Sequence, residues 1–169
     1  MDSEVPQLLL DGQRDRAFEK IVALYANKVF RLVLSLIGDA ARAEEVSQDV
    51  FVKIRQAMDV FDPKRAAVGT WVYRIAHNTA LTHLRAESYR QTLPIDSVDE
   101  PQVSAAEPEG IRHLVEQLPE ELREVVVLYY YEERAVDEVA AMLELPSGTV
   151  KSHLSRARRV LAEMMKGAR

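Results

Sequence analysis

The stretch from Leu145 to Arg159 constrains this chain most, because a Pro-Ser-Gly turn leads there into a basic, amphipathic segment. Turn residues of this kind precede helices, and Ser147 or Thr149 can cap the helix that follows. Apolar residues recur at helical spacing and predict one buried stripe, made of Val150, Leu154, Ala157 and Leu161. The opposite face has side chains suited to phosphates and base edges in a DNA major groove: Lys151, Ser152, Ser155, Arg156 and Arg159.

A second short helix is expected just upstream, from Val136 to Leu143, with Val139, Ala140 and Leu143 directed inward. Helix, tight turn and basic helix together form a helix-turn-helix. An ordinary helical hairpin with a solvated charged face fits the same spacing. Charge favours the first interpretation, because residues 149–169 hold six Lys or Arg and one acid in a chain of formal net charge -5.

Composition excludes several classes of site. The 169 residues are 47% hydrophobic, which is enough for one ordinary domain or two small ones with packed cores. Without cysteine there is no disulfide, thiolate zinc site or thiol nucleophile, and the four histidines lie far apart, so we expect no metal and no cofactor. No apolar run approaches the roughly 20 residues of a membrane span, and the first residues are acidic, so we expect a soluble, cytoplasmic protein without membrane insertion.

Charge and proline divide the chain into two domains. Residues 94–110 contain five acids, no base and three of the seven prolines, so 93–110 is predicted to be a flexible acidic linker between domains at 1–92 and 111–169. Basic residues outnumber acids in 51–93 and again in 149–169, as expected of two separate nucleic-acid contacts. No segment has the period of a strand. The predicted fold is all-α, with two small helical domains and a helix-turn-helix in the second.

In the first domain, helical spacing predicts a short helix at 5–10, a core helix at 17–37 and a third helix at 41–58. The third helix buries Val46, Val50, Ile54 and Met58. Its other face mixes acidic, amide and apolar groups, among them Glu44, Glu45, Gln48, Asp49, Phe51 and Val52. Such a face suits a protein partner, and a plain solvated face fits the spacing equally well.

Phe61-Asp62-Pro63 ends this helix, and after a loop at 64–68 a new helix runs from Gly69 to about Arg90. It combines aromatic, amide and basic groups, as single-strand binding sites do: Trp71, Tyr73, Arg74, His77, Asn78 and Arg85. Trp71 and Tyr73 also fit as core aromatics, and for Trp71 that alternative is favoured. In the second domain, helices are expected at 111–118 and 119–131.

In this order and spacing, the motifs resemble the extracytoplasmic-function (ECF) sigma factors, the small initiation subunits of bacterial RNA polymerase. The resemblance runs from about Arg14 to Met165. Residues 43–51 resemble the core-polymerase-binding helix, 61–63 with 69–78 the minus-ten recognition and melting segment, and 118–125 with 146–152 the minus-thirty-five domain. The chain departs from the family's usual Gly-Leu-Ser-Tyr before the helix-turn-helix, where it has Glu133-Arg134-Ala135-Val136.

The resemblance implies a role for each set of residues. Glu45, Gln48, Asp49, Phe51 and Arg55 would contact the clamp coiled coil of core polymerase. Trp71, Tyr73, Arg74, His77, Asn78 and Arg85 would recognise and melt the minus-ten element, with Asn78 reading a flipped base of the non-template strand. Lys151, Ser152, Ser155, Arg156 and Arg159 would bind the minus-thirty-five duplex. An anti-sigma factor is implied as a further partner, and enzymatic activity is not.

Two other functions remain open on the residues alone. An autonomous helix-turn-helix regulator would bind duplex DNA without polymerase, although it gives no reason for the match at residues 44–51. A sigma-like decoy would bind only an anti-sigma factor, although it would have no use for the basic face at 151–159.

Overall fold

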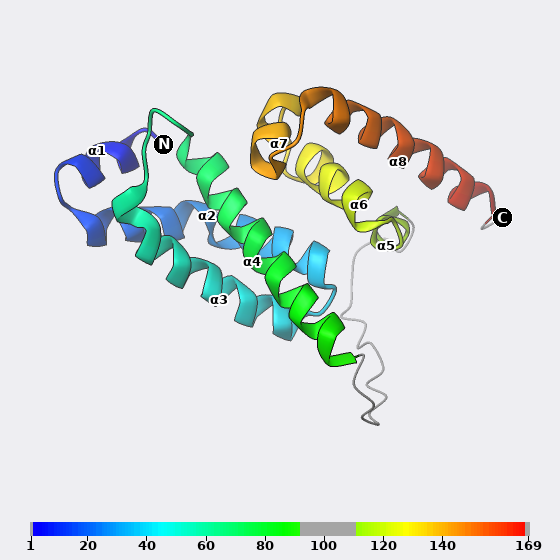
Figure 1. Cartoon of the computed structure of the whole chain (residues 1–169), viewed down its shortest axis with the longest axis horizontal. Coiled ribbons are helices and arrows are strands. Elements are labelled where there is room, and N and C mark those ends of the chain that lie inside the picture. Colours follow the sequence, from blue (N-terminus) through cyan, green and yellow to red (C-terminus); the bar gives the residue numbers. More distant parts are fainter. Residues whose placement is uncertain (1, 92–110, 168–169) are drawn as a thin grey trace. The chain divides into compact units, whose positions relative to one another are not determined.

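The computed structural model describes residues 2–91 and 111–167, and every regular element in these ranges is helical (Figure 1). The chain divides into two compact units, Met1–Asp99 and Glu100–Arg169. The all-α prediction is therefore confirmed. The acidic linker predicted at 93–110 lies outside the described residues.

The first unit is built on three long helices that pack against one another: α2 (Arg14–Ile37), α3 (Ala40–Ala57) and α4 (Val68–Gln91). The short helix α1 (Glu4–Leu10) packs on α2, and a 3₁₀ turn, η1 (Met58–Val60), follows α3. The predicted buried side of α3 is confirmed, since Val46, Val50, Ile54 and Met58 are at most 3% exposed. Together with residues of α2 and α4, among them Ile21, Tyr25, Leu32, Val72 and Ala76, they form the core.

Local chemistry sets the boundary between α2 and α3. Gly38 ends α2 with φ at +78°, a left-handed conformation that glycine adopts without steric cost, as the Gly38-Asp39 pair predicted. Asp39 then begins α3, because its carboxylate accepts a hydrogen bond of 2.8 Å from the backbone N–H of Arg42. The tight turn lets α3 fold back along α2.

The second unit contains α5 (Ile111–Glu116), α6 (Glu120–Val126), η2 (Val127–Tyr131), α7 (Val136–Leu143) and α8 (Ser147–Gly167). Helices α6 and α7 both pack on α8. The predicted helix at 119–131 is interrupted, since its last five residues form a π-helical turn. The core of the second unit includes Val115, Leu118, Leu122, Val125, Val126, Val127, Leu128, Val139, Ala140, Met142, Val150, Leu154 and Ala157.

Two inward residues of the second unit differ from the prediction. Met142 is buried, whereas Leu143 is only half-buried at the end of α7, and Ile111 is 57% exposed at the start of α5. Leu143 and Ile111 are both terminal positions of short helices, where one neighbouring turn is missing. The apolar stripe of α8 is as predicted over Val150, Leu154 and Ala157, while Leu161 is half-buried.

The predicted helix-turn-helix forms from α7 and α8. A polar contact stabilises the N-terminal end of each of these helices. The Glu138 carboxylate accepts a hydrogen bond of 2.9 Å from the backbone N–H of Ala135, which is one half of a capping box. Ser147, the first residue of α8, donates its hydroxyl to Asp137 of α7 over 2.8 Å. The contact between Ser147 and Asp137 holds the start of α8 against the start of α7.

Candidate functional site

The exposed face of α3 carries all five residues predicted to meet a protein partner. Glu45, Gln48, Asp49 and Arg55 are exposed and Phe51 is half-buried. At one edge, Asp49 Oδ2 lies 2.9 Å from Nε2 of His83 on α4. At the other edge, Arg55 Nη2 lies 2.7 Å from Oδ1 of Asp15 on α2. The five residues therefore span α3 from its α4 side to its α2 side.

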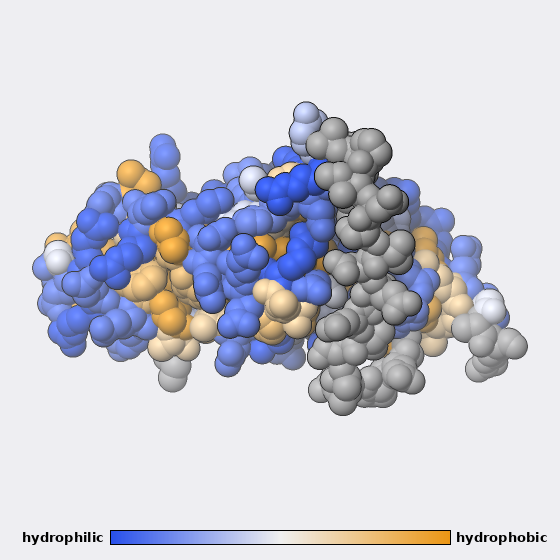
Figure 2. All heavy atoms as spheres, turned by 90° about the horizontal axis from the view of Figure 1, so that it is seen from below, coloured by the Kyte–Doolittle hydropathy of each residue, from blue (hydrophilic) through white to orange (hydrophobic). Residues whose placement is uncertain are grey.

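An apolar groove of about 680 Å³ lies between α2 and α3, along the α2 edge of this face. It is lined by Phe18, Val22, Phe51 and Val52, with Arg14, Gln48, Arg55 and Gln56 around them. The Arg55 guanidinium lies 5.1 Å from the centroid of the Phe18 ring, a cation–π distance. Figure 2 shows the first unit from below, where α3 lies, and there hydrophobic side chains interrupt the hydrophilic surface. An apolar centre with a polar rim is the usual anatomy of a protein interface.

The groove explains two residues that the sequence assigned to the core. Phe18 and Val22 are at the right spacing for the buried stripe of α2, but both are only half-buried. Both side chains line the groove, so neither is fully covered by α3. Val52, at 55% exposure, is opposite them on α3.

Four of the six residues predicted for single-strand binding lie along one face of α4. Trp71, Arg74, Asn78 and Arg85 follow one another at three, four and seven residues, so their side chains point to the same side. Asn78 and Arg85 are exposed, and Trp71 and Arg74 are half-buried. Phe61, from the preceding loop, packs on Trp71 with ring centroids 4.8 Å apart. The stripe thus begins with a partly exposed aromatic pair.

The other two residues of that set face the interior. Tyr73 is fully buried against Tyr25, with ring centroids 6.2 Å apart and planes at 88°, and His77 is 8% exposed. The favoured assignment of Trp71 to the core is wrong in this respect, since Tyr73 takes that place. Two residues apart on a helix, the pair points about 200° apart, so only one of them can face the core. Tyr73 and His77 are therefore not part of the exposed stripe.

The sequence analysis missed Tyr89, which is 74% exposed on α4. Its spacing of four residues from Arg85 and eleven from Asn78 continues the same stripe. This spacing could have identified Tyr89 as part of the stripe, but a position so near the predicted end of the helix is weak evidence for a face.

The basic face of α8 is exposed as predicted, at Lys151, Ser152, Ser155, Arg156 and Arg159. Neighbouring elements hold the arginines at its borders. Arg156 lies 3.7 Å from the Glu121 carboxylate of α6. Arg158, which the prediction left out, donates to the Tyr130 hydroxyl over 2.7 Å and lies 5.7 Å from the centre of that ring. The π-helical turn thus aims a tyrosine at one border of the face.

Metal and membrane chemistry find no support in the part of the chain that the structure describes. No group of three or more His, Asp or Glu there is arranged to hold a metal ion. Among residues 2–91 and 111–167, no helix is long and apolar enough to cross a lipid bilayer.

Family models match most of the chain. The model of Sigma-70 region 2 matches residues 21–90, and that of Sigma-70 region 4 matches residues 109–161. The chain belongs to the sigma-70 family. Within it, this sigma factor is 30% identical over 177 residues to the ECF RNA polymerase sigma factor SigW of Bacillus subtilis, covering 92% of this chain and 91% of SigW. It is 31% identical over 166 residues to the ECF RNA polymerase sigma-E factor of Escherichia coli, covering 86% and 85%.

Solved structures share the fold. CnrH in complex with the cytosolic domain of CnrY has 25% sequence identity and a TM-score of 0.70, over 94% of this chain and 96% of that one. The sigma factor RpoE in complex with the anti-sigma factor NepR from Bartonella quintana has 23% identity and a TM-score of 0.73, over 90% and 98%. This chain is thus an ECF sigma factor, a protein that binds bacterial core RNA polymerase and directs promoter-specific initiation.

Proposed function

We propose that three surfaces divide the work of this sigma factor. The α3 face and its groove bind core polymerase, the α4 stripe captures the non-template strand of the minus-ten element, and the α8 face reads the minus-thirty-five duplex. The observation that carries the proposal is the chemical difference between these exposed faces: acidic and apolar on α3, aromatic and basic on α4, basic with small polar groups on α8. In domain terms, 1–92 would bind polymerase and the minus-ten element, and 111–169 the minus-thirty-five element.

Strand capture by α4 follows from its chemistry. Unstacked bases gain about 1 to 3 kcal/mol each by stacking on aromatic side chains, and the Phe61–Trp71 pair is such a platform. Asn78 is exposed on the same stripe, where its amide can both donate to and accept from a base edge. The guanidinium groups of Arg74 and Arg85 can pair with phosphates of the DNA backbone. Opening of the promoter duplex is then driven by the binding of α4 to the non-template strand that becomes single-stranded.

Duplex binding by α8 needs a different surface. A helix that enters the major groove requires short side chains where it approaches the bases, and Ser152 and Ser155 provide them. Arg156 has the fork that pairs with a guanine edge, and Lys151 and Arg159 are placed for phosphates. Binding by such a face weakens with salt, with a slope near 0.9 per neutralised phosphate.

An anti-sigma factor is proposed as the regulator. RpoE of Bartonella quintana is bound by the anti-sigma factor NepR, and CnrH by the cytosolic domain of CnrY. In this chain, a protein that competes with core polymerase could bind in the apolar groove beside α3. The proposal assigns no covalent step and no cofactor to the chain, and places its action in the cytoplasm, with the polymerase.

Run-off transcription with purified core polymerase and a promoter library tests the proposal. We expect transcripts that start downstream of a shared two-part motif, and we expect Asp49→Arg to reduce core binding and transcript yield at least about tenfold. Glu19→Arg is the matched control, because it makes the same change of charge at an exposed position of α2 away from the α3 face. This variant should retain core binding and transcript yield.

Each failure points to a different function. Duplex binding without transcription would favour an autonomous regulator, and absence of both would favour a decoy. If Asp49→Arg binds core polymerase as the wild type does, the assignment of the α3 face is wrong.

A further inference from the structure

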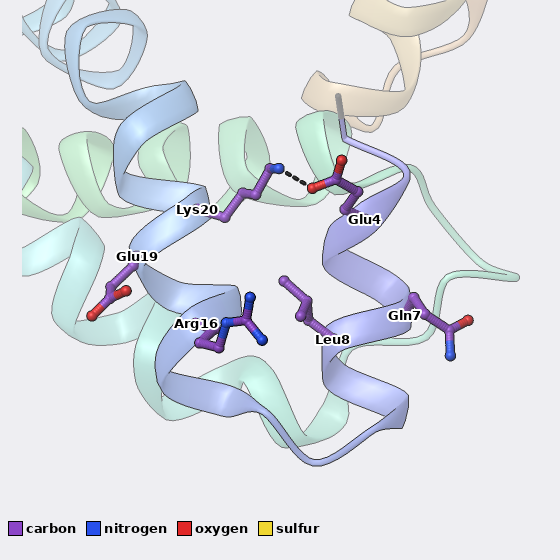
Figure 3. A pocket seen from close by; sticks show the side chains of 6 residues that line it. All are labelled: Glu4, Gln7, Leu8, Arg16, Glu19 and Lys20. Atoms are coloured by element: carbon purple, nitrogen blue, oxygen red, sulfur yellow. Dashed lines mark hydrogen bonds and ion pairs between the residues drawn. The ribbon is translucent and has the colours of Figure 1, made fainter.

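Helix α1 lies outside the residues that match Sigma-70 region 2, yet it is fastened to the first unit. Val5 is fully buried. Lys20 of α2 and Glu4 of α1 point toward one another and form an ion pair (Figure 3). The hydrogen bond from Lys20 holds the pKa of the Glu4 carboxyl below its usual range. The third contact is a hydrogen bond from the Tyr25 hydroxyl to the Asp2 carboxylate.

This third contact reaches the start of α4. Gly69, the second residue of α4, is buried, and a Cβ placed on it would lie 3.0 Å from the Tyr25 hydroxyl and 3.7 Å from Asp2 Oδ2. Figure 1 shows the N-terminal end of the chain beside the loop that leads into α4. The Asp2 carboxylate therefore lies against the first turn of α4. Negative charge is favoured there, because the first N–H groups of a helix have no partner within it.

Tyr25 carries the contact from Asp2 to the next residues of α4. Its ring meets Tyr73 edge to face, and both rings are buried. Tyr73 is two residues from Trp71, whose ring packs on Phe61. Because a packed interior transmits small displacements, a shift of the Tyr25 ring would displace the first two turns of α4.

We propose that Asp2 is a positioning residue for minus-ten recognition. By fixing the Tyr25 hydroxyl beside Gly69, it orients the start of α4 and so presents the Phe61–Trp71 pair to unstacked bases. Asp2 itself touches no DNA. The inference rests on the proposed role of the α4 stripe in strand capture.

The first test reads the position of Trp71 directly. Trp71 is the single tryptophan of the chain, so the fluorescence of the free full-length protein reports on it alone when excitation is at the red edge, where tyrosine does not absorb. Asp2→Ala and Tyr25→Phe each remove one partner of the hydrogen bond, and we expect each to raise the acrylamide quenching constant about twofold. Asp2→Asn keeps an acceptor and should restore most of the wild-type value. Glu4→Gln removes the other polar tether of α1 and should leave quenching unchanged.

The second test separates strand opening from promoter binding in the holoenzyme. In abortive initiation, Asp2→Ala and Tyr25→Phe should each lower the rate of open-complex formation about tenfold and change promoter affinity less than about twofold. The double variant should be no slower than either single one, since both remove the same contact. Asp2→Asn should open the promoter at a rate close to that of the wild type.

Three results would overturn the inference. If Asp2→Ala and Tyr25→Phe open promoters at the wild-type rate while Asn78→Ala is impaired, the role of α4 stands and Asp2 has no part in it. If Glu4→Gln is as slow as Asp2→Ala, docking of α1 in general, and not Asp2, is required. If Asn78→Ala has no effect on opening or base preference, the proposed role of the α4 stripe fails, and this inference fails with it.

Discussion

Glu133 occupies a left-handed backbone conformation, with φ at +51°, in the connection between η2 and α7. A side chain in this region costs about 1 to 2 kcal/mol, and glycine avoids that cost at the expense of a more flexible unfolded chain. We expect Glu133→Gly to stabilise the second unit by about 0.5 to 1 kcal/mol. Calorimetry should show its Tm raised by about 2 to 6 °C, given the size of this unit.

Glu133→Ala is the matched control for this prediction. It removes the same carboxylate but keeps a Cβ at the left-handed position, so its Tm should not rise. An equal rise in both variants would mean that removal of charge, and not relief of the backbone, is responsible.

Single residues also show where sequence reasoning ends. The helical period identified Val46, Val50, Ile54 and Met58 as buried, because a stripe of apolar residues has only one way to face a core. Trp71 and Tyr73 both fitted as core aromatics on sequence alone and the core was favoured for Trp71, but Tyr73 is the one that is fully buried. Packing decides between them: Tyr73 meets Tyr25, 48 residues away in the sequence, and no local pattern contains that contact.

At the scale of elements, α4 can pack closely on α2 because Gly69 has no side chain. A Cβ there would lie 3.0 Å from the Tyr25 hydroxyl, which is buried and hydrogen-bonded to Asp2 and so has little room to move. In the Tyr25→Phe background the obstructing oxygen is gone, and alanine then contributes its better helix propensity. We expect Gly69→Ala to be more favourable in that background than in the wild type, by about 1 kcal/mol.

Thermal unfolding of the four proteins of this cycle measures the coupling. Gly148→Ala, also near the start of a helix but with open space around its Cα, should show no such dependence on Tyr25. Additive effects of Gly69→Ala and Tyr25→Phe would mean that the two helices tolerate the extra carbon by moving apart.

Elements were predicted from sequence more completely than the surfaces between them. Helices α2, α3 and α4 were expected with both ends within about three residues, because caps and breakers such as Gly38, Asp39 and Pro63 are local signals. The groove beside α3 was not expected, since its lining comes from two helices and not from either one alone. The contact between Asp49 and His83 joins residues 34 apart for the same reason.

For the whole molecule, charge is separated along the chain in a way that the net value conceals. The formal net charge of -5 would disfavour binding to DNA, but residues 94–110 alone contribute five acids and no base. Lys and Arg outnumber Asp and Glu in residues 149–169, where the α8 face lies, and in the segment that contains α4. Two units that each contact one promoter element weakly gain affinity from being linked, so neither needs high affinity alone.

This division of labour predicts that defects in the two units multiply. Asn78→Ala, by removing one base contact, should lower open-complex formation about tenfold and relax base preference in the minus-ten element only. Arg156→Ala should weaken binding to the minus-thirty-five element about tenfold and reduce the salt slope if Arg156 also neutralises a phosphate. The two residues belong to different units and share no partner. The double variant should therefore form open complexes about 100-fold less well than the wild type, which is the product of the two single defects.

Matched controls use similar side chains elsewhere. Asn27→Ala changes an exposed amide of α2, and Arg112→Ala an exposed arginine of α5, and neither should alter promoter use. Holoenzyme titrations on one promoter, with each element mutated in turn, give all the required rates. A double variant no worse than Asn78→Ala alone would mean that the upstream contact matters only after the downstream strand is held, and the two units would then act in sequence and not independently.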